Sequence, residues 1–596
     1  MSRESPDDRR LDPPSRRKPD TALLAAGWGS LWGLALGEWL LAPAIANAHF
    51  VHPRTTGEWI ALTTGLGAVL VGMGVFLSLF AGILLVFKEG LSKFRDRVWA
   101  YGLATGPLII AAYAVDSLLI HWMNFRSLRA LSPHVSTAGA LLLAWLLISA
   151  CFARVYTRLT TRTTRPRPER LAFVLVFAGL TGAAVVPLRI LPAPPEVPAL
   201  GALNRLADRA DDRPLLFIGL DSGTWRVLDP LIASGAAPHL RALAERGIRG
   251  DVEALWPPYW SGAAWAAIVT GFPQDVTGVY EELGGSGPGL PPFQVPLDSR
   301  VLLNPFFSAR YLLMRSGILR FTPPPRALLN GRPFWQLLHE AGVPTAVVRF
   351  RFTYPATGQG DIVVSDWVGH DQWELLGVRR DGATDIVAPT TLVDELLAPF
   401  AEDIQSDEPL FAELLPGPKV DRPADAVLDP FLALRSAAGI DRRTFEVSEL
   451  ILKRDPRRSV LAIYLDGFDA VAHAFWQYRF PEDFQDNKPA PSDVERLGPV
   501  IDRYVRHLDH RLGKLLALYA KEPDVLIVSD HGHGPTTFNS NWRGWHTQQG
   551  IFLLAGPQVS HSPERIRVSY YDVAPTVLHL KHFEKPVSLR GSSVLR

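Results

Sequence analysis

Long apolar stretches dominate the first two hundred residues of this chain of 596 residues. The five longest lie at residues 23–46, 59–87, 98–122, 137–155 and 171–191. Each has about 20 residues or more, the length that a helix needs to cross about 30 Å of hydrocarbon. Polar positions would interrupt the core of a soluble domain more often. The pattern therefore predicts a five-helix transmembrane domain over residues 21–192.

Basic residues between the apolar stretches predict how this domain lies in the membrane. Lys and Arg are concentrated in the N-terminal tail, residues 1–20, and in the loops after the second and fourth stretches. Such loops stay in the cytoplasm. Five spans then place the following chain outside the cytoplasm of what we expect to be a bacterial cell. Residues 193–212 begin with several prolines and are expected to form a linker.

Two features of the spans leave alternatives open. The tripeptide Ala46-Asn47-Ala48 follows a basic start and an apolar run, as a signal-peptidase site does. Cleavage there would leave four spans and the same outer location for the rest of the chain. Glu38 and Asp116 place ionisable groups inside spans, where they are costly. They indicate either a lipid head-group site or hydrogen bonds between helices.

From residue 213 onward, short apolar runs alternate with longer helical patterns. The apolar runs of strand length lie at residues 214–220, 344–348, 460–465, 525–528 and 551–554. The helical patterns between them lie at residues 238–247, 334–341 and 500–520. This alternation predicts an α/β domain over residues 213–596, with a mostly parallel sheet covered by helices on both faces. Residues 283–332 and 369–443 are rich in Pro and Gly and are predicted to be insertions that form a lid or recognition cap.

Composition excludes some classes of site and partner. The formal net charge is +1, and the C-terminal half has no clusters of basic residues, so we expect no binding to a nucleic-acid polymer. The chain has one cysteine, Cys151, which excludes intramolecular disulfides and cysteine-rich zinc sites. A metal site must therefore be built from His, Asp and Glu.

Side chains that bind metal ions gather near the ends of the predicted strands. This set contains three carboxylates and three imidazoles, Asp221, Asp469, His473, Asp530, His531 and His546. In parallel sheets, ligand sites lie beyond the carboxyl ends of the strands. Imidazole together with carboxylate suits Zn²⁺ or a similar divalent ion. Six ligands are too many for one tetrahedral ion, so the set predicts two ions that share a bridging group.

The pair Asp469 and His473 has a competing interpretation. Four positions apart, both would project from one face of a helix, either as ligands or as an ordinary surface pair. Asp466 lies nearer to the strand end, but its spacing to His473 is less suitable, so we favour Asp469. His533 is interpreted as a residue that supports the ligands or is solvated.

Ser261 is the candidate for the bridging group. It precedes a run of small residues that is predicted to be helical, so Ser261 lies where free N–H groups and the helix dipole favour an anion. The alternative is a purely structural role, in which Ser261 only caps the helix. A bound metal ion stabilises a serine alkoxide near neutral pH, which favours a nucleophile. Trp260 and Trp265 are assigned to packing rather than to stacking on a substrate.

The order of these motifs resembles the alkaline phosphatase superfamily, and most closely its type I phosphodiesterase/nucleotide pyrophosphatase branch. The motifs are FIGLD at 217–221, residues 261–271, Asp469-x-x-x-His473, SDHG at 529–532 and GWH at 544–546. Weaker matches lie at residues 334–342, 353–355 and 571–576. The resemblance runs from about residue 213 to residue 580, apart from the insertions, and implies an alkaline phosphatase-like fold.

The resemblance also implies roles for individual residues. One divalent ion, expected to be Zn²⁺, would be held by Asp221, Ser261, Asp530 and His531. A second would be held by Asp469, His473 and His546. Ser261 would attack phosphorus and form a covalent phospho-enzyme, which water or an alcohol then cleaves. Further candidates, for contact with the substrate phosphate, are Asn541, Arg543 and Arg349, with Arg351 as an alternative.

Three functions remain open at this stage. The favoured one is a membrane-anchored phosphodiesterase or phosphohydrolase that acts on an extracytoplasmic phosphoester or phospholipid. The alternative is a phospho-group transferase that modifies an envelope lipid or glycan, because five spans before such a domain resemble the phosphoethanolamine and phosphoglycerol transferases of bacterial envelopes. A non-catalytic scaffold or transporter is disfavoured by the complete set of ligands.

Overall fold

The structure is a computed structural model. It describes residues 198, 200–206, 213–255, 261–279, 283–287, 290–295, 320–322, 325–368, 385–401, 407–415, 430–484, 488–535 and 544–595. The predicted cytoplasmic tail, the five spans and most of the linker lie outside these residues, and so do Asn541 and Arg543. Within the described residues, none of the helices combines the length and the apolar character needed to cross a membrane.

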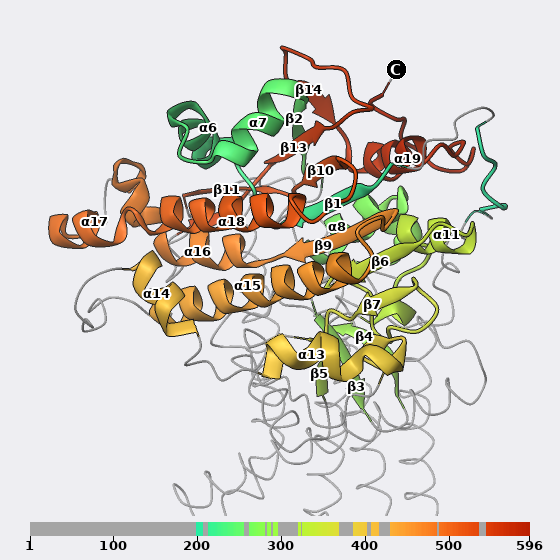
Figure 1. Ribbon diagram of the computed structural model, residues 1–596. Coiled ribbons are helices and arrows are strands. Elements are labelled where there is room, and N and C mark those ends of the chain that lie inside the picture. The colour runs from blue at the N-terminus through green and yellow to red at the C-terminus, as the bar shows by residue number, and fades with distance from the viewer. Residues whose placement is uncertain are drawn as a thin grey trace, which may run out of the picture. The chain divides into compact units, whose positions relative to one another are not determined.

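A nine-stranded sheet forms the middle of the α/β domain, in the order β14-β2-β13-β10-β1-β9-β6-β7-β8 (Figure 1). Its strands are β1 (Leu215–Leu220), β2 (Ile248–Glu253), β6 (Thr345–Val348), β7 (Ile362–Val364), β8 (Val387–Ala388), β9 (Val460–Leu465), β10 (Asp524–Val528), β13 (Gln549–Ala555) and β14 (Ile566–Val568). The strands from β10 to β7 run parallel. Strand β13 is antiparallel to both of its neighbours, and β8 is antiparallel at the edge. The predicted mostly parallel sheet is confirmed.

The central strands are apolar throughout because both faces of the sheet are covered. Every residue of β1, β9 and β10 is buried. Along β1, Leu216 and Ile218 pack into one apolar cluster, whereas Leu215 and Phe217 pack into another. This alternation follows from side chains that point to opposite faces of a strand.

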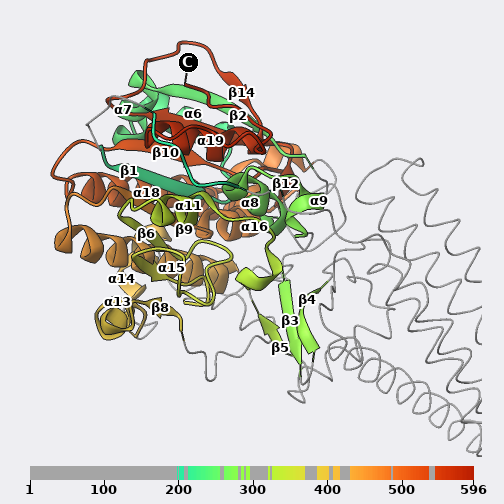
Figure 2. The same ribbon diagram turned by 90° about the vertical axis from the view of Figure 1, so that its right-hand side faces the viewer.

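Helices cover the two faces of the sheet (Figure 1, Figure 2). The cluster on one face includes α6 (Trp225–Ser234), α7 (Pro238–Arg246), α15 (Pro430–Arg454), α16 (Gly467–Arg479) and α18 (Val500–Leu516). The other cluster includes α8 (Ser261–Thr270), α11 (Phe334–Glu340) and α19 (Tyr570–Leu580). Shorter helices are α9 (Gln274–Thr277), α13 (Val393–Ala401), α14 (Glu408–Leu414) and α17 (Pro491–Leu497), with 3₁₀ turns η2 (Arg326–Leu328), η3 (Thr390–Leu392) and η5 (Pro481–Asp483).

The two stretches predicted to be insertions contain regular elements. In the first, β3 (Leu283–Gly287), β4 (Leu290–Val295) and β5 (Arg320–Thr322) form a separate sheet in the order β4-β3-β5. The second contains β8, α13, α14 and the beginning of α15, which packs on the sheet. The start of α15 is buried through consecutive small residues, Ser436 to Gly439, so it lacks the one-sided apolar pattern of a surface helix. A role as a lid or cap stays a prediction.

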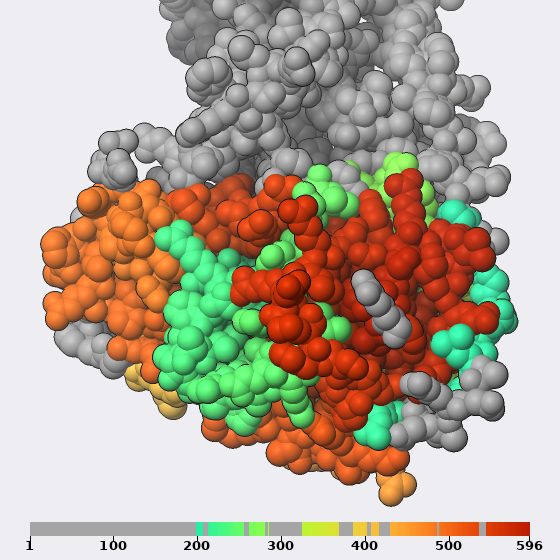
Figure 3. All heavy atoms as spheres, turned by 90° about the horizontal axis from the view of Figure 1, so that it is seen from above, coloured from blue at the N-terminus to red at the C-terminus, as the bar shows by residue number. Residues whose placement is uncertain are grey.

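Segments far apart in the sequence meet at the carboxyl edge of the parallel strands. Because β13 runs against β10, the amino end of β13 lies beside the carboxyl end of β10, with Phe552 opposite Val528. A short hairpin of β11 (Gly532–Pro535) and β12 (Gly544–Thr547) extends this edge. From above, the green segments around β2 adjoin the red segments around β13 and β14 (Figure 3).

Candidate active site

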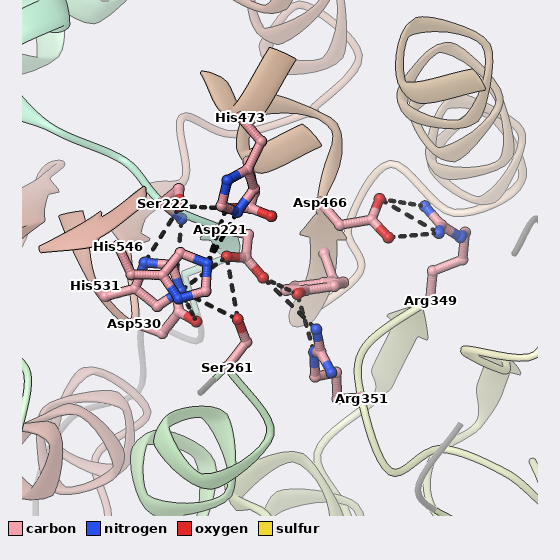
Figure 4. Close-up of polar contacts among 12 residues, drawn as sticks. Asp221, Ser222, Ser261, Arg349, Arg351, Asp466, His473, Asp530, His531 and His546 are labelled. Carbon is pink, nitrogen blue, oxygen red and sulfur yellow. Dashed lines mark hydrogen bonds and ion pairs between the residues drawn. The ribbon is translucent and has the colours of Figure 1, made fainter. Parts of the chain in front are cut away.

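The predicted metal ligands converge at this carboxyl edge (Figure 4). Asp221 follows β1, and Asp530 and His531 follow β10. Asp469 and His473 lie on the first two turns of α16, which begins just after β9. His546 lies on β12, opposite His533 of β11. The metal ligands that the sequence predicted therefore lie near four strand ends at one edge of the domain.

The first half-site consists of Asp221, Asp530, His531 and Ser261, all of them buried. His531 Nε2 lies 3.5 Å from Asp221 Oδ1 and 3.3 Å from Asp530 Oδ2. Ser261 Oγ lies 3.3 Å from Asp221 Oδ1 and 3.2 Å from His531 Nε2. The four ligand atoms thus surround one small space.

The second half-site consists of Asp469, His473 and His546. The two imidazole Nε2 atoms, of His473 and His546, lie 3.0 Å apart. Asp469 Oδ1 lies 3.2 Å from His473 Nε2 and 3.5 Å from His546 Nε2. The structure therefore brings together all seven residues that the sequence named as ligands.

The spacing of these atoms fits divalent cations. Ligands about 2.0–2.1 Å from a tetrahedral zinc ion lie about 3.3–3.4 Å from one another, and the contacts in both half-sites span 3.0–3.5 Å. Asp530 Oδ2 is buried and accepts no hydrogen bond from the described residues. A buried carboxylate oxygen that accepts no hydrogen bond is costly unless a cation satisfies it. The donor set and this oxygen support the prediction of divalent metal ions.

Burial and neighbouring charges shape the protonation of the half-sites. Burial raises the pKa of Asp221 well above its usual value, and the carboxylates of Asp530 and Asp469 raise it further. Burial also acts to raise the pKa of Asp469, but His473 and His546 outweigh it and hold that pKa well below its usual value. Burial lowers the pKa of His546 to about 3, so its imidazole is neutral at pH 7. A neutral imidazole has the lone pair that a metal ion requires.

Ser261 is the first residue of α8, as the small-residue pattern predicted. Every residue of this helix is buried, and its small side chains allow close packing against α19. Its first turn lies at the site, where the positive end of the helix dipole favours an anion. Trp265 packs edge-on against Phe350 and Tyr464, which agrees with its assignment to packing. Trp260 lies outside the described residues.

Arg351 approaches Asp221 from another direction (Figure 4), and the Tyr464 hydroxyl contacts both of them. The Tyr464 hydroxyl donates to Asp221 Oδ2 and accepts from Arg351 Nε at 3.0 Å. A terminal nitrogen of Arg351 lies 3.8 Å from Asp221 Oδ2. Tyr464 was missed because it lies inside the apolar run of β9, where nothing distinguishes it from a core aromatic residue.

Arg349, which the sequence named for contact with substrate phosphate, lies in a different environment. It is 1% exposed, and its guanidinium donates to Asp466 Oδ2 at 3.2 Å and to Thr444 Oγ1 at 3.0 Å. The structure does not bring it to the half-sites, and the candidate that lies there is Arg351. The same ion pair holds Asp466 away from the imidazoles, so Asp469 is the aspartate that faces them.

A buried carboxyl group lies behind the helix that carries Asp469. Asp441 of α15 is fully buried and accepts a hydrogen bond from Tyr504 at 2.7 Å. Burial, reinforced by the charge of Asp466, raises the pKa of Asp441 to about 8. A Cβ on Gly467, the first residue of α16, would meet this carboxyl, so the group sets where α16 starts.

We expect the Asp441→Asn variant to lose a pH dependence of stability. The folded pKa of about 8 lies above the unfolded value of about 3.9, so the contribution is complete below about pH 4 and is lost as the pH rises to about 8. The loss is about 1.4 kcal/mol per pH unit. Urea unfolding between about pH 5 and pH 8 should give a flatter dependence in the variant than in the wild type. The exposed Asp394→Asn serves as a control with the wild-type slope, and a wild-type slope in Asp441→Asn would contradict the prediction.

Two more polar side chains touch the half-sites. His533 is 2% exposed, so it is not solvated, and its Nδ1 lies 3.7 Å from Asp469 Oδ1; with Asp469 and His473 it forms a further group that could hold a metal ion. Ser222 is fully buried beside Asp221 and was not identified from the sequence, because a serine after a strand is typical of turns.

Parts of this chain are similar in sequence to known proteins. Residues 215–572, more than half of the chain, match the family model described as type I phosphodiesterase / nucleotide pyrophosphatase. The 2,3-bisphosphoglycerate-independent phosphoglycerate mutase of Dinoroseobacter shibae is 33% identical over 96 residues, which are 15% of this chain and 18% of that enzyme. This chain therefore spans less than a fifth of the curated relative that it matches.

Solved structures resemble the chain more distantly. Phosphonoacetate hydrolase from Sinorhizobium meliloti has 17% identity and a TM-score of 0.30, over 56% of this chain and 61% of that one. Phosphonate monoester hydrolase from Silicibacter pomeroyi has 13% identity and a TM-score of 0.34, over 64% and 76%. The alkaline phosphatase PafA has 11% identity and a TM-score of 0.37, over 65% and 99%.

Proposed function

Because this chain belongs to the type I phosphodiesterase / nucleotide pyrophosphatase family, we propose that it hydrolyses a phosphoester with Ser261 as nucleophile and two divalent cations as cofactors. The family match confirms the resemblance drawn from the motifs and supports the class of phosphoric ester hydrolase. One observation carries the proposal, namely two sets of ligand atoms spaced 3.0–3.5 Å apart, the first of which includes the buried Ser261 hydroxyl. Zn²⁺ is the proposed ion, because the ligands are imidazoles and carboxylates.

The chain's own residues support an in-line substitution at phosphorus. Cations held by the two half-sites would stabilise the serine alkoxide and polarise a phosphoryl oxygen. Ser261 Oγ attacks phosphorus, and the bond to the leaving oxygen breaks as that oxygen takes up a proton. The N–H groups at the start of α8 favour the phosphate at this position. Water then attacks the phosphoseryl group, which releases the phosphate product and restores the serine hydroxyl.

Arg351 is our candidate for contact with the substrate phosphate. Its guanidinium lies beside Asp221 and Tyr464 at the half-sites, and the side chain keeps 12% exposure. A guanidinium donates paired N–H groups to phosphate oxygens. Arg349, two positions earlier, uses its donors inside the protein.

Replacing Arg351 with alanine is expected to lower kcat/KM about 10–100-fold. A hydrogen bond to a charged group contributes about 1.5–3 kcal/mol, which corresponds to this factor. Steady-state kinetics on any phosphoester that the protein turns over would measure the change. Arg454→Ala removes an exposed arginine paired with Glu395 and controls for the loss of one positive charge. Wild-type kcat/KM in Arg351→Ala would remove Arg351 from the substrate site.

We also propose the location and the substrate class. The apolar stretches and basic loops of the first 192 residues support a protein anchored in the cytoplasmic membrane, with the α/β domain outside the cytoplasm. The substrate is then an extracytoplasmic phosphoester, either a soluble phosphodiester or a phospholipid at the membrane. A phospho-group transferase is the second candidate, because five spans exceed what anchoring one domain requires.

A substrate panel tests these functions. Full-length protein in detergent, loaded with zinc, would be offered p-nitrophenyl phosphate, bis(p-nitrophenyl) phosphate and labelled phosphatidylethanolamine with a lipid or glycan acceptor. Release of nitrophenol or of a free head group supports the hydrolase. Transfer of label to the acceptor without release supports the transferase. No turnover of any of these phosphoesters, with two zinc ions bound, would contradict both.

A further inference from the structure

Ser222, the residue after Asp221, has a backbone conformation that residues with a Cβ avoid. Its φ is 63°, in the left-handed region. For a residue other than glycine this conformation costs about 1–2 kcal/mol. Strained conformations of this kind persist at functional sites, where the surrounding contacts hold them. The next residue is Gly223, so the chain has a glycine directly after the strained position but not at it.

The Ser222 hydroxyl contacts both half-sites (Figure 4). It donates to Asp469 Oδ1 of the second half-site at 2.5 Å. It lies 3.2 Å from His531 Nδ1, which belongs to the first half-site, and 3.0 Å from His533 Nδ1. The backbone N–H of Ser222 donates to Asp530 Oδ1 at 3.4 Å. One strained residue after β1 therefore contacts candidate ligands that follow two other strands, β9 and β10.

The protons in this cluster have a consistent arrangement. His531 Nε2 faces Asp221 and Asp530, so it serves as the ligand atom and needs its lone pair. A proton on Nδ1 then faces two acceptors, the Ser222 hydroxyl oxygen at 3.2 Å and the Gly532 carbonyl oxygen at 3.1 Å. A hydrogen bond to the second ring nitrogen fixes the tautomer of a histidine ligand. Ser222 thus donates to Asp469 and lies, together with the Gly532 carbonyl, against the Nδ1 side of the His531 ring.

His533 supports the same hydroxyl. Its ring is buried, and its Nε2 has no hydrogen-bond partner among the described residues. A buried N–H without an acceptor is costly, so the proton of this ring lies on Nδ1, which faces Ser222 Oγ. The Nδ1 atoms of two imidazoles, those of His531 and His533, therefore face one serine oxygen. Its own proton is thereby directed to Asp469 Oδ1.

We propose that Ser222 is a positioning residue that ties the two half-sites together and sets the affinity for the divalent cations. The proposal rests on the two-cation site of the proposed function. Asp469 needs this support most, because its side chain is 24% exposed, whereas Asp221 and Asp530 are at most 2% exposed. Without the hydroxyl, Asp469 and His531 each lose a group that orients them toward a cation.

Zinc titration of the metal-free, full-length protein in detergent tests this role. Calorimetry would compare the wild type with Ser222→Gly, which removes the hydroxyl and adopts a φ of 63° without strain. Metal-free Ser222→Gly is therefore expected to melt at the wild-type temperature or above it. Removing a residue that orients metal ligands weakens binding about 10–100-fold, and we expect this loss for at least one of the two zinc ions.

Two further variants separate the hydroxyl from the backbone. Ser222→Ala removes the same hydroxyl but keeps a strained Cβ, so it should show the same loss of affinity with a lower melting temperature than Ser222→Gly. Ser448→Ala removes a buried hydroxyl of α15 that is bonded to the Thr444 carbonyl, and should bind zinc as the wild type does. Wild-type zinc affinity in Ser222→Gly overturns the proposal. A wild type that binds fewer than two zinc ions overturns the proposed function instead.

Discussion

The Ser261→Ala variant is expected to lose at least about 1,000-fold in kcat while its fold stays intact. The hydroxyl lies at the start of α8, within 3.3 Å of Asp221 and His531, and no other described hydroxyl takes this place. In other enzymes, removing a nucleophile leaves the slow reaction that the remaining binding groups support. The residual rate of Ser261→Ala should therefore be attack by water alone.

Two measurements would check this expectation. Steady-state kinetics gives kcat, and rapid acid quenching with a phosphorus-labelled substrate should trap label on the wild type and none on Ser261→Ala. Ser448→Ala, which removes a buried serine hydroxyl far along α15, is the matched control and should keep wild-type kcat. A kcat within about tenfold of the wild type in Ser261→Ala would contradict the assignment of the nucleophile.

The Asp530→Asn variant is expected to separate stability from activity. Asp530 is fully buried near Asp221, and burial raises the pKa of both carboxyl groups. Without cations, two carboxylates in a buried space repel each other, and a neutral amide of the same shape removes this repulsion. Metal-free Asp530→Asn should therefore melt at or above the temperature of the metal-free wild type. It should nevertheless lose about 1,000-fold or more in kcat, since a lost cation removes about 4 kcal/mol of transition-state stabilisation.

Thermal unfolding with a chelator, and then with excess zinc, would measure both effects. Zinc at about 1,000 times its Kd stabilises a protein by about 4 kcal/mol, so zinc should raise the melting temperature of the wild type more than that of the variant. Exposed Asp394→Asn should respond to zinc as the wild type does. Wild-type kcat in Asp530→Asn, with two zinc ions bound, would exclude Asp530 as a ligand.

The central strands could be predicted from the sequence, whereas the two outer strands on each side of the sheet could not. Strand β9, Val460–Leu465, is an unbroken apolar run and coincides with its predicted range. Strand β2, Ile248–Glu253, was missed because it carries three charged residues between its buried ones. Strands β7, β8 and β14 have only two or three residues each, which is too short for a recognisable pattern.

The direction of a strand could not be predicted from the pattern of apolar and polar residues. The run at β13 predicts a strand, but nothing in its side chains says that it runs against β10. Only that direction brings the chain before β13, and with it His546, to the carboxyl edge of the parallel strands. The ligand His546 was identified through its motif, and its place in the fold follows from the sheet.

At the site, too, the sequence predicted the types of residue better than it predicted their positions in space. The seven candidate ligands were predicted from ordered motifs, and the structure brings them together. Arg349 and Arg351 are two positions apart, and the sequence favoured the wrong one for the half-sites. The loop that carries them has positive φ at Arg349 and at Phe352, so side chains along it do not alternate as they do in a strand. Backbone geometry of this kind leaves no signal in the residue types.

The place of β1 in the sheet bears on how the protein is made. This strand leaves the ribosome before the other strands of the sheet, yet its partners are β9 and β10, whose pairing begins at Val460 and Asp524. Both edges of β1 stay open until β9 is made, and one edge stays open until β10 is made. Open edges of apolar strands allow chains to associate with one another. A polypeptide cut short before Asp524 would keep that open edge and lack Asp530, His531 and His546. Truncated chains are therefore expected to aggregate or be degraded, with no partial activity to preserve.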